Sequence, residues 1–294
     1  MPEMGDIKGY AYVLIAVFMI AMSANGIDYV LQGNNVETSS FLWNLSALIG
    51  ASLIVVFSKE RANLIPTLKK YWKVLAIVGI FQGIAMLGWF FSIQAIGPEI
   101  SSFLGRIGTL VLVILSVVFL NEKFNFGEAF GAALVLLGVY IITFSPIEFL
   151  GWRVIYIVIG GSFYAVAQLL IKKNIKDITP LIFTFTSSVM IFLTILGYAL
   201  ASGNLHAPNL DSLPVLAAIP VLSEVVAVIL VTSSYNYIGA GKSQVIRSAF
   251  PFVVVIYSYV LYRTVLLAHQ FFSGTLIIAG AVLLILSRRN SVKQ

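Results

Sequence analysis

The sequence contains no cysteine and few charged residues. Without cysteine, the 294-residue chain has no disulfide, no thiol nucleophile and no thiolate ligand for a metal. Its two histidines, His206 and His269, lie far apart and form no cluster with metal-ligand spacing. Charged residues make up 10% of the chain, against roughly 25% in an average soluble protein. These absences argue against a soluble domain, and we predict neither a metal nor another cofactor.

The sequence also lacks long polar segments. Its longest connections, 59–71 and 202–211, are too short to form domains. Residues 1–9 carry Glu3 and Asp6 and do not resemble the basic start of a cleavable signal. The apolar run that follows, of about 20 residues, exceeds the ~7–15 residues of a signal peptide. We therefore expect almost the whole chain to lie in the membrane.

Hydrophobic residues make up 60% of the chain and gather in ten long stretches. About 20 apolar residues cross the ~30 Å hydrocarbon layer as a helix. A lone span must be helical, because only a helix satisfies its own backbone hydrogen bonds in lipid. The predicted spans are 10–31, 39–58, 72–96, 100–120, 127–145, 152–172, 179–201, 212–237, 243–263 and 266–287.

The second half of the sequence repeats the first at a fixed offset of 142 residues, without a gap from 92 to 142. Because each half contains an odd number of spans, the two copies must lie upside down relative to each other. We predict an all-α membrane protein with ten transmembrane helices in two inverted five-helix repeats, 1–148 and 149–294. This architecture is typical of secondary transporters. The identical pairs are Ser92/Ser234, Ile96/Ile238, Gly97/Gly239, Ser101/Ser243, Val111/Val253, Val113/Val255, Ile114/Ile256, Ser116/Ser258, Val118/Val260, Phe130/Phe272, Leu134/Leu276 and Gly138/Gly280.

The net charge of +6 is distributed as in a membrane protein. With the N-terminus in the cytoplasm, fourteen of the 18 lysines and arginines fall on cytoplasmic segments and two, Arg153 and Arg263, on outer ones. Such a bias orients a protein in the membrane. We therefore predict a multi-pass protein of the cytoplasmic membrane with both termini in the cytoplasm, and no nucleic-acid partner.

The chain resembles the drug/metabolite transporter superfamily, specifically its EamA-type exporters with ten helices. The resemblance covers nearly the whole length and is most specific in three stretches: 95–104 (AIGPEISSFL), 120–123 (LNEK) and 130–139 (FGAALVLLGV). It implies transport of small metabolites or drugs through a central cavity. It also implies that Glu122 is a feature of the fold, and we interpret Glu128 as a charge at a helix end.

Two polar residues fall at equivalent depths near the middle of their spans. Glu224 lies about twelve residues into its span, and Gln82 stands opposite it in the repeat register. A charge at the membrane centre costs at least ~2.5–3.5 kcal/mol and usually marks a functional site. We predict a substrate or proton site at this pair. The other interpretation is an interhelical hydrogen bond, typically worth ~0.6 kcal/mol.

Arg106 and Arg247 also lie inside predicted spans, at an offset of 141 residues. The inverted repeat predicts one arginine toward each mouth of a cavity, where each attracts an anionic group or pairs in turn with Glu224. The planar guanidinium suits carboxylate or phosphate. The other interpretation is that their side chains snorkel to the lipid head groups, above all for Arg247, which lies near a span end.

Several further residues are candidates for substrate contacts. We expect Trp89 to line the cavity, and Asn25 and Asn44 either line it or serve packing and the interface. Tyr164 and Gln168 share one helix face at i, i+4. Glycines spaced four apart, including Gly127 and Gly131, predict close helix packing. Pro220 and Pro251 are the expected kinks, because each removes a backbone hydrogen bond.

Together these patterns predict a secondary active transporter that exports small metabolites, amino acids or drug-like compounds, by alternating access. Its partners are a small-molecule substrate and the lipid bilayer, with protons as a candidate coupling ion, and it is a monomer or homodimer. The alternatives are a nucleotide-sugar or phosphate-ester exchanger of the same superfamily and a non-transporting receptor or subunit. No set of catalytic residues stands at one depth, so we do not predict an enzyme.

Overall fold

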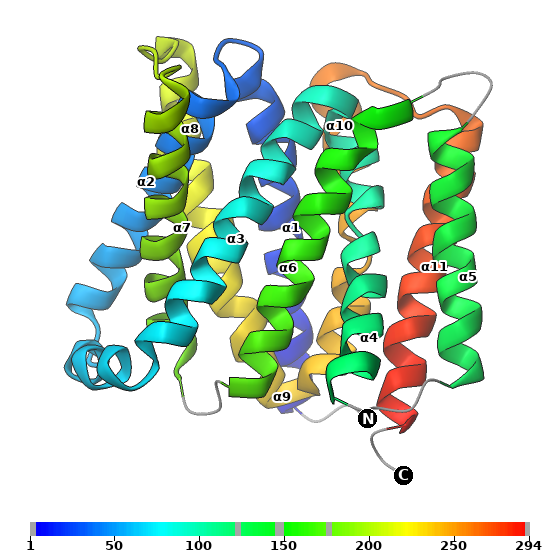
Figure 1. Ribbon diagram of the computed structural model, residues 1–294, viewed down its shortest axis with the longest axis horizontal. Helices are drawn as coiled ribbons and strands as arrows, with labels where there is room; N and C mark the ends of the chain where they lie inside the picture. Colours follow the sequence, from blue (N-terminus) through cyan, green and yellow to red (C-terminus); the bar gives the residue numbers. More distant parts are fainter. Residues whose placement is uncertain (1–3, 121–124, 145–149, 175–177, 292–294) are drawn as a thin grey trace.

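The computed structural model describes residues 4–120, 125–144, 150–174 and 178–291, which form a bundle of helices (Figure 1). Both chain ends lie at the same end of the bundle, as the figure shows. The helices are α1 Met4–Leu31, α2 Val36–Phe57, α3 Arg61–Leu104, α4 Ile107–Leu120, α5 Phe126–Thr143, α6 Ile155–Asn174, α7 Pro180–Ser202, α8 Leu213–Pro220, α9 Ala227–Arg247, α10 Phe250–Tyr262 and α11 Ala268–Ser291. Two short 3-10 helices, Gly151–Val154 and Leu210–Ser212, precede α6 and α8, and a π-helix, Val221–Val226, joins α8 to α9.

Within the described residues, nine helices are long and apolar enough to cross a membrane, and a shorter apolar helix covers Ile107–Phe119. The boundaries of the third and fourth predicted spans need correction. Gly97 joins them inside α3 as a kink, because its φ of 78° lies in a region that glycine adopts without steric cost. The rest of α3 after this kink then continues into α4 as one crossing. The prediction of an all-α membrane protein is confirmed.

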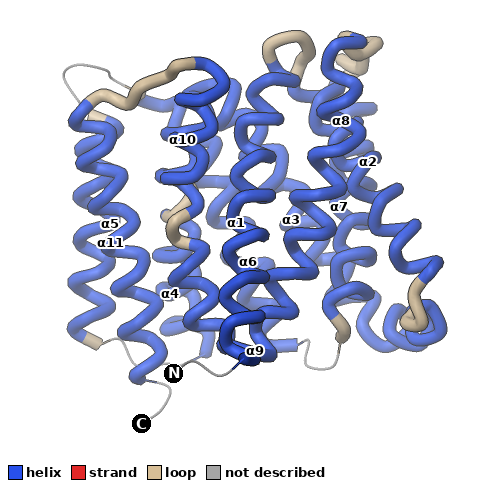
Figure 2. The backbone as a smooth tube through the Cα atoms, turned by 180° about the vertical axis from the view of Figure 1, so that it is seen from behind, coloured by secondary structure: helices blue, strands red, loops and turns tan. Residues whose placement is uncertain are grey.

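Helix packing follows the inverted repeat. In the first half α3 packs on α6, and in the second half α9 packs on α1. Likewise α4 packs on α6 as α10 packs on α1. The last crossings of the two halves, α5 and α11, pack against each other at one end of the bundle (Figure 2). The two halves therefore interlock rather than lie side by side.

Side-chain contacts repeat at the same offset of 142 residues. The hydroxyls of Ser92 and Ser101 are 2.7 Å apart, and those of Ser234 and Ser243 are 2.9 Å apart. Each bond links two consecutive crossings across their turn. The start of α5 is closed by a capping box, in which Glu128 accepts from the Asn125 amide at 2.8 Å. This confirms the interpretation of Glu128, whereas Glu122 lies outside the described residues.

The counterpart of this cap stands at the start of α11. Gln270 accepts from the Leu267 amide at 2.9 Å, and both residues lie 142 positions after the pair in α5. A helix that begins in an apolar environment must satisfy its first N–H groups, and these buried side chains do so. The repeat therefore extends to the way in which the helices begin.

Glycines let α5 and α11 approach closely. A Cβ atom at Gly131 would lie 2.8 Å from the carbonyl oxygen of Gly280, and one at Gly280 would lie 2.6 Å from that of Gly131. The symmetry-related contact, between Gly138 and the Ser273 carbonyl, is equally short at 2.7 Å. Small residues are the usual means by which membrane helices pack. The packing role predicted for Gly131 is thus confirmed.

Replacing Gly131 with valine should lower the melting temperature of the detergent-purified protein by several degrees. The new side chain meets backbone atoms of α11, which cannot move aside as a flexible side chain does. Gly197→Val is the control, because nothing lies within 4 Å of a Cβ atom there. Equal melting temperatures for the two variants would contradict the packing.

Candidate functional site

The central feature of the bundle is a pair of helix breaks, one in each half. In the first, α3 ends at Leu104 and α4 begins at Ile107. In the second, α9 ends at Arg247 and α10 begins at Phe250. The breaks agree with the repeat to within one residue. Helices broken inside the membrane, at the interface of inverted repeats, commonly form substrate sites in transporters.

Arg106 lies in the first break and reaches the second. Its Nη2 donates to the Arg247 carbonyl oxygen at 3.0 Å. Its guanidinium carbon lies 5.4 Å from the centre of the Phe250 ring, a cation–π distance. The Trp89 ring lies 6.3 Å from the same phenylalanine. One arginine therefore links α3, α9 and α10.

Arg247 is surrounded by polar groups. Its Nη1 donates to Gln244 Oε1 at 3.4 Å, and Gln244 Nε2 donates to the Tyr235 hydroxyl at 3.5 Å. Arg247 also interacts electrostatically with the hydroxyls of Tyr235 and Tyr164. Because Tyr164 lies on α6, the cluster joins helices of both halves.

The two guanidinium groups lie close enough to repel each other. In the described part of the chain, no carboxylate forms an ion pair with either of them. The prediction of one arginine toward each mouth is therefore wrong. The breaks lie about a third of a crossing from opposite ends, and the two long side chains bring the charges together between them.

Glu224 lies apart from the arginines, in the π-helix after Pro220. Its Oε1 accepts from the Ser223 hydroxyl at 3.2 Å. The Trp43 indole lies near the carboxyl group, but its nitrogen has no hydrogen bond of good geometry. π-helical turns occur often at functional sites. Glu224 is therefore a partly exposed carboxyl group on an irregular, apolar segment.

Gln82 faces the same interior region from α3. Met86, Trp89 and Phe90, one and two turns further along, pack into the apolar cluster that contains Trp43. Gln82 Oε1 is buried and has no hydrogen-bond partner among the described residues. Such an atom costs about 1–3 kcal/mol unless a partner arrives. No hydrogen bond joins Gln82 to Glu224 in this conformation.

The remaining predicted residues divide between the cluster and the helix packing. Trp89 lies beside Phe250, as described above, and the partly exposed Gln168 follows Tyr164 by one turn on α6. Asn25 is buried: its Nδ2 donates to the Val254 carbonyl at 3.3 Å, and its Oδ1 accepts from Ser258 at 2.7 Å. Asn44 donates to the Ser40 carbonyl within α2 at 2.8 Å. In this conformation both asparagines serve packing.

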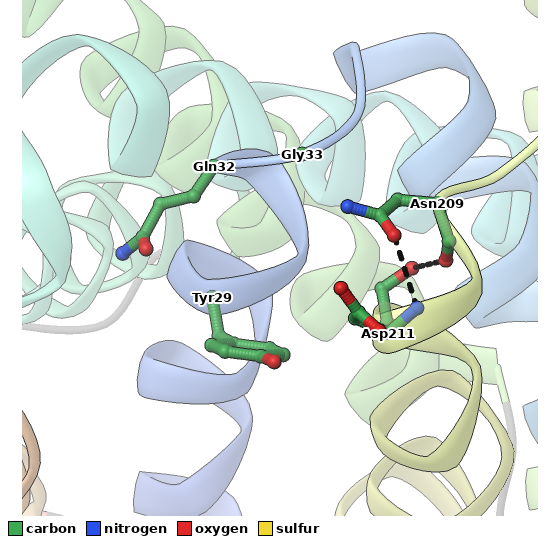
Figure 3. Close-up of a pocket in the computed structure, with 6 residues that line it drawn as sticks. Tyr29, Gln32, Gly33, Asn209 and Asp211 are labelled. Atoms are coloured by element: carbon green, nitrogen blue, oxygen red, sulfur yellow. Dashed lines mark hydrogen bonds between the residues drawn. The ribbon is translucent and has the colours of Figure 1, made fainter.

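A polar pocket of about 180 Å³ lies at the end of the bundle opposite the termini (Figure 3). Tyr29 of α1 stands on one side of it, and Asn209 and Asp211 stand on the other. The Asn209 side chain caps this turn by accepting from the Asp211 amide at 3.0 Å. None of the residues predicted as site residues lines the pocket.

The sequence offered little signal for three members of the arginine cluster. Phe250, Gln244 and Tyr235 are residue types common in any membrane helix. Only their place near Arg247, and near the break before Pro251, marks them. A search for polar residues around the expected kink in the ninth span would have found Gln244.

Comparisons with known proteins agree with this architecture. A profile described as the EamA-like transporter family matches residues 7–144 and 151–286, once in each half. A solved structure titled "Crystal structure of protein" has a TM-score of 0.59 and 15% identity, with 99% of each chain covered. At that identity the likeness shows the fold alone. No curated protein matches the sequence significantly.

Proposed function

Because the chain belongs to the EamA-like transporter family, we propose that it exports small metabolites, such as amino acids or drug-like compounds, by alternating access. The observation that supports this best is the contact between the two helix breaks through Arg106 and Arg247. A substrate at that contact touches both halves of the repeat. Relative motion of the halves around it opens the site to one side and then the other.

The proposed substrate contacts are the two arginines, Trp89, Tyr164 and Gln168. We propose Glu224 and Gln82 as the coupling region, with protons as the coupling ion. Glu224 supplies a carboxyl group that can take up a proton, and Gln82 supplies a buried oxygen that lacks a partner. We propose transport rather than catalysis, since none of these groups forms a nucleophile–base pair.

An efflux screen tests the proposal. Cells that overproduce the protein should tolerate raised concentrations of at least one amino acid, amino acid analogue or dye. They should also release that compound faster than cells with an empty vector. Equal tolerance and equal release across the panel would favour the alternative of a non-transporting receptor or subunit.

We further propose that both termini lie in the cytoplasm of a cell whose cytoplasmic membrane holds the protein. Both termini and the lysine-rich stretch around Lys69 lie at the same end of the bundle in Figure 1, and the turn at Asn209 lies at the other. The positive-inside bias then places Asn209 outside the cell.

Cysteine labelling should confirm this orientation, because the native chain contains no cysteine. A membrane-impermeant thiol reagent added to intact cells should label Asn209→Cys. It should label the matched variant Asn63→Cys, at the exposed opposite end, only after the cells are opened. The reverse pattern would invert the proposed topology.

A further inference from the structure

The arginine cluster carries positive charge that the described residues do not balance. Two guanidinium groups repel each other across the helix breaks, and neither has a carboxylate partner. Glu224 is not among the groups that act on either arginine. An unbalanced charge inside a membrane is costly, and two adjacent charges of the same sign are more so.

Most donors of Arg106 are also unused. Arginine has five N–H donors, and in the described residues one of them finds a protein acceptor, the Arg247 carbonyl. That carbonyl, at the end of α9, offsets a small part of the positive charge, because helix C-termini carry a partial negative charge. Enough donors remain free to bind two oxygen atoms of a single group.

We propose that the transported substrate carries a carboxylate or phosphate group that binds between Arg106 and Arg247, with an apolar body against Trp89 and Phe250. This inference rests on the proposed transport function and names its substrate class. The guanidinium fork binds two oxygens of such a group at once. The Tyr164 and Tyr235 hydroxyls, which already interact with Arg247, are further donors for a third oxygen.

The aromatic residues define the rest of the ligand. The Phe250 ring contacts the Arg106 cation on one side and lies near Trp89 on the other. Trp89 packs against both large apolar clusters of the bundle, so its position is fixed from two sides. A flat or apolar substrate body fits against these rings, adjacent to the charged group.

Binding of small aromatic probes to the purified protein in detergent tests the inference. The probes are phenylacetate, phenyl phosphate and the neutral phenylacetamide, titrated while tryptophan fluorescence is followed. We expect at least one anion to bind the wild-type protein at least about tenfold more tightly than the amide. The better anion identifies carboxylate or phosphate as the preferred group. If neither anion binds more tightly than the amide, the inference is wrong.

Substitutions locate the binding. Arg106→Gln and Arg247→Gln should each weaken binding of the better anion by at least about tenfold. Arg153→Gln, which removes an exposed arginine from the turn before α6, should leave it unchanged. Unchanged binding in both cluster variants would place the anion elsewhere and overturn the inference. The wild-type comparison of acid with amide needs no variant, so it holds even where a substitution prevents folding.

Flux measurements separate this inference from the proposed function. If the wild-type protein transports neutral solutes and both Gln variants do so equally well, the protein is a transporter without an anion requirement, and the inference fails. If the variants lose anion binding but the wild-type protein moves no solute, the site exists and the proposed function fails.

Discussion

Replacing Arg106 with alanine reduces substrate flux by at least about tenfold, whereas Arg247→Lys retains a large part of it. Alanine removes the hydrogen bond to the Arg247 carbonyl and the cation beside Phe250. Hydrogen bonds that involve a charged group contribute about 1.5–3 kcal/mol, and 1.4 kcal/mol corresponds to tenfold. Lysine at position 247 keeps the charge and loses the planar fork.

The measurement is initial flux at matched amounts of membrane-inserted protein. Arg153→Ala is the matched control, since it removes an exposed arginine and should transport as the wild-type protein does. If Arg106→Ala transports as well as the wild-type protein, the helix breaks do not hold the substrate. The site would then have to be sought elsewhere in the bundle.

Glu224→Gln is expected to abolish the response of transport to an imposed pH gradient. The amide keeps the shape of the side chain and can still accept from Ser223, but it cannot ionise. Removal from water disfavours the charged form of a carboxyl group, and nearby groups change that balance. A carboxyl group that moves between two environments can therefore take up a proton on one side and release it on the other.

Proteoliposomes with and without a pH gradient check this expectation. The wild-type protein should accumulate substrate faster when the gradient is present, and Glu224→Gln should exchange substrate at one slow rate under both conditions. Asn44→Asp is an informative comparison, because it adds a carboxyl group to the adjacent α2 without restoring position 224. If Glu224→Gln responds to the gradient as the wild-type protein does, Glu224 is a packing residue.

The repeat could be predicted in detail because it is written in identical residues at a constant offset. Ser92 and Ser101 recur as Ser234 and Ser243, and the structure gives both pairs the same hydrogen bond. The cap of α5 by Glu128 followed from its place at a helix start. Features that depend on one helix and its ends are accessible in this way.

The arrangement of the arginines was not accessible. An offset shows that two positions are equivalent, but it does not show how far either lies from the symmetry axis. The break beside Arg106 also has no proline, since Thr109 stands where the second half has Pro251. Packing of the two breaks against each other determines this geometry, and no local pattern records such a contact. The same holds for the π-helix at Glu224, of which only the proline before it gives a sign.

Counterflow in proteoliposomes tests the central claim most directly. Vesicles that contain the purified protein are loaded with unlabelled compound and diluted into a trace of the labelled form. The panel contains amino acids, aromatic carboxylates and phosphate esters. We predict transient accumulation of at least one anionic compound above its outside concentration, and its loss in Arg106→Gln. No accumulation above protein-free vesicles for any compound would contradict transport through this site.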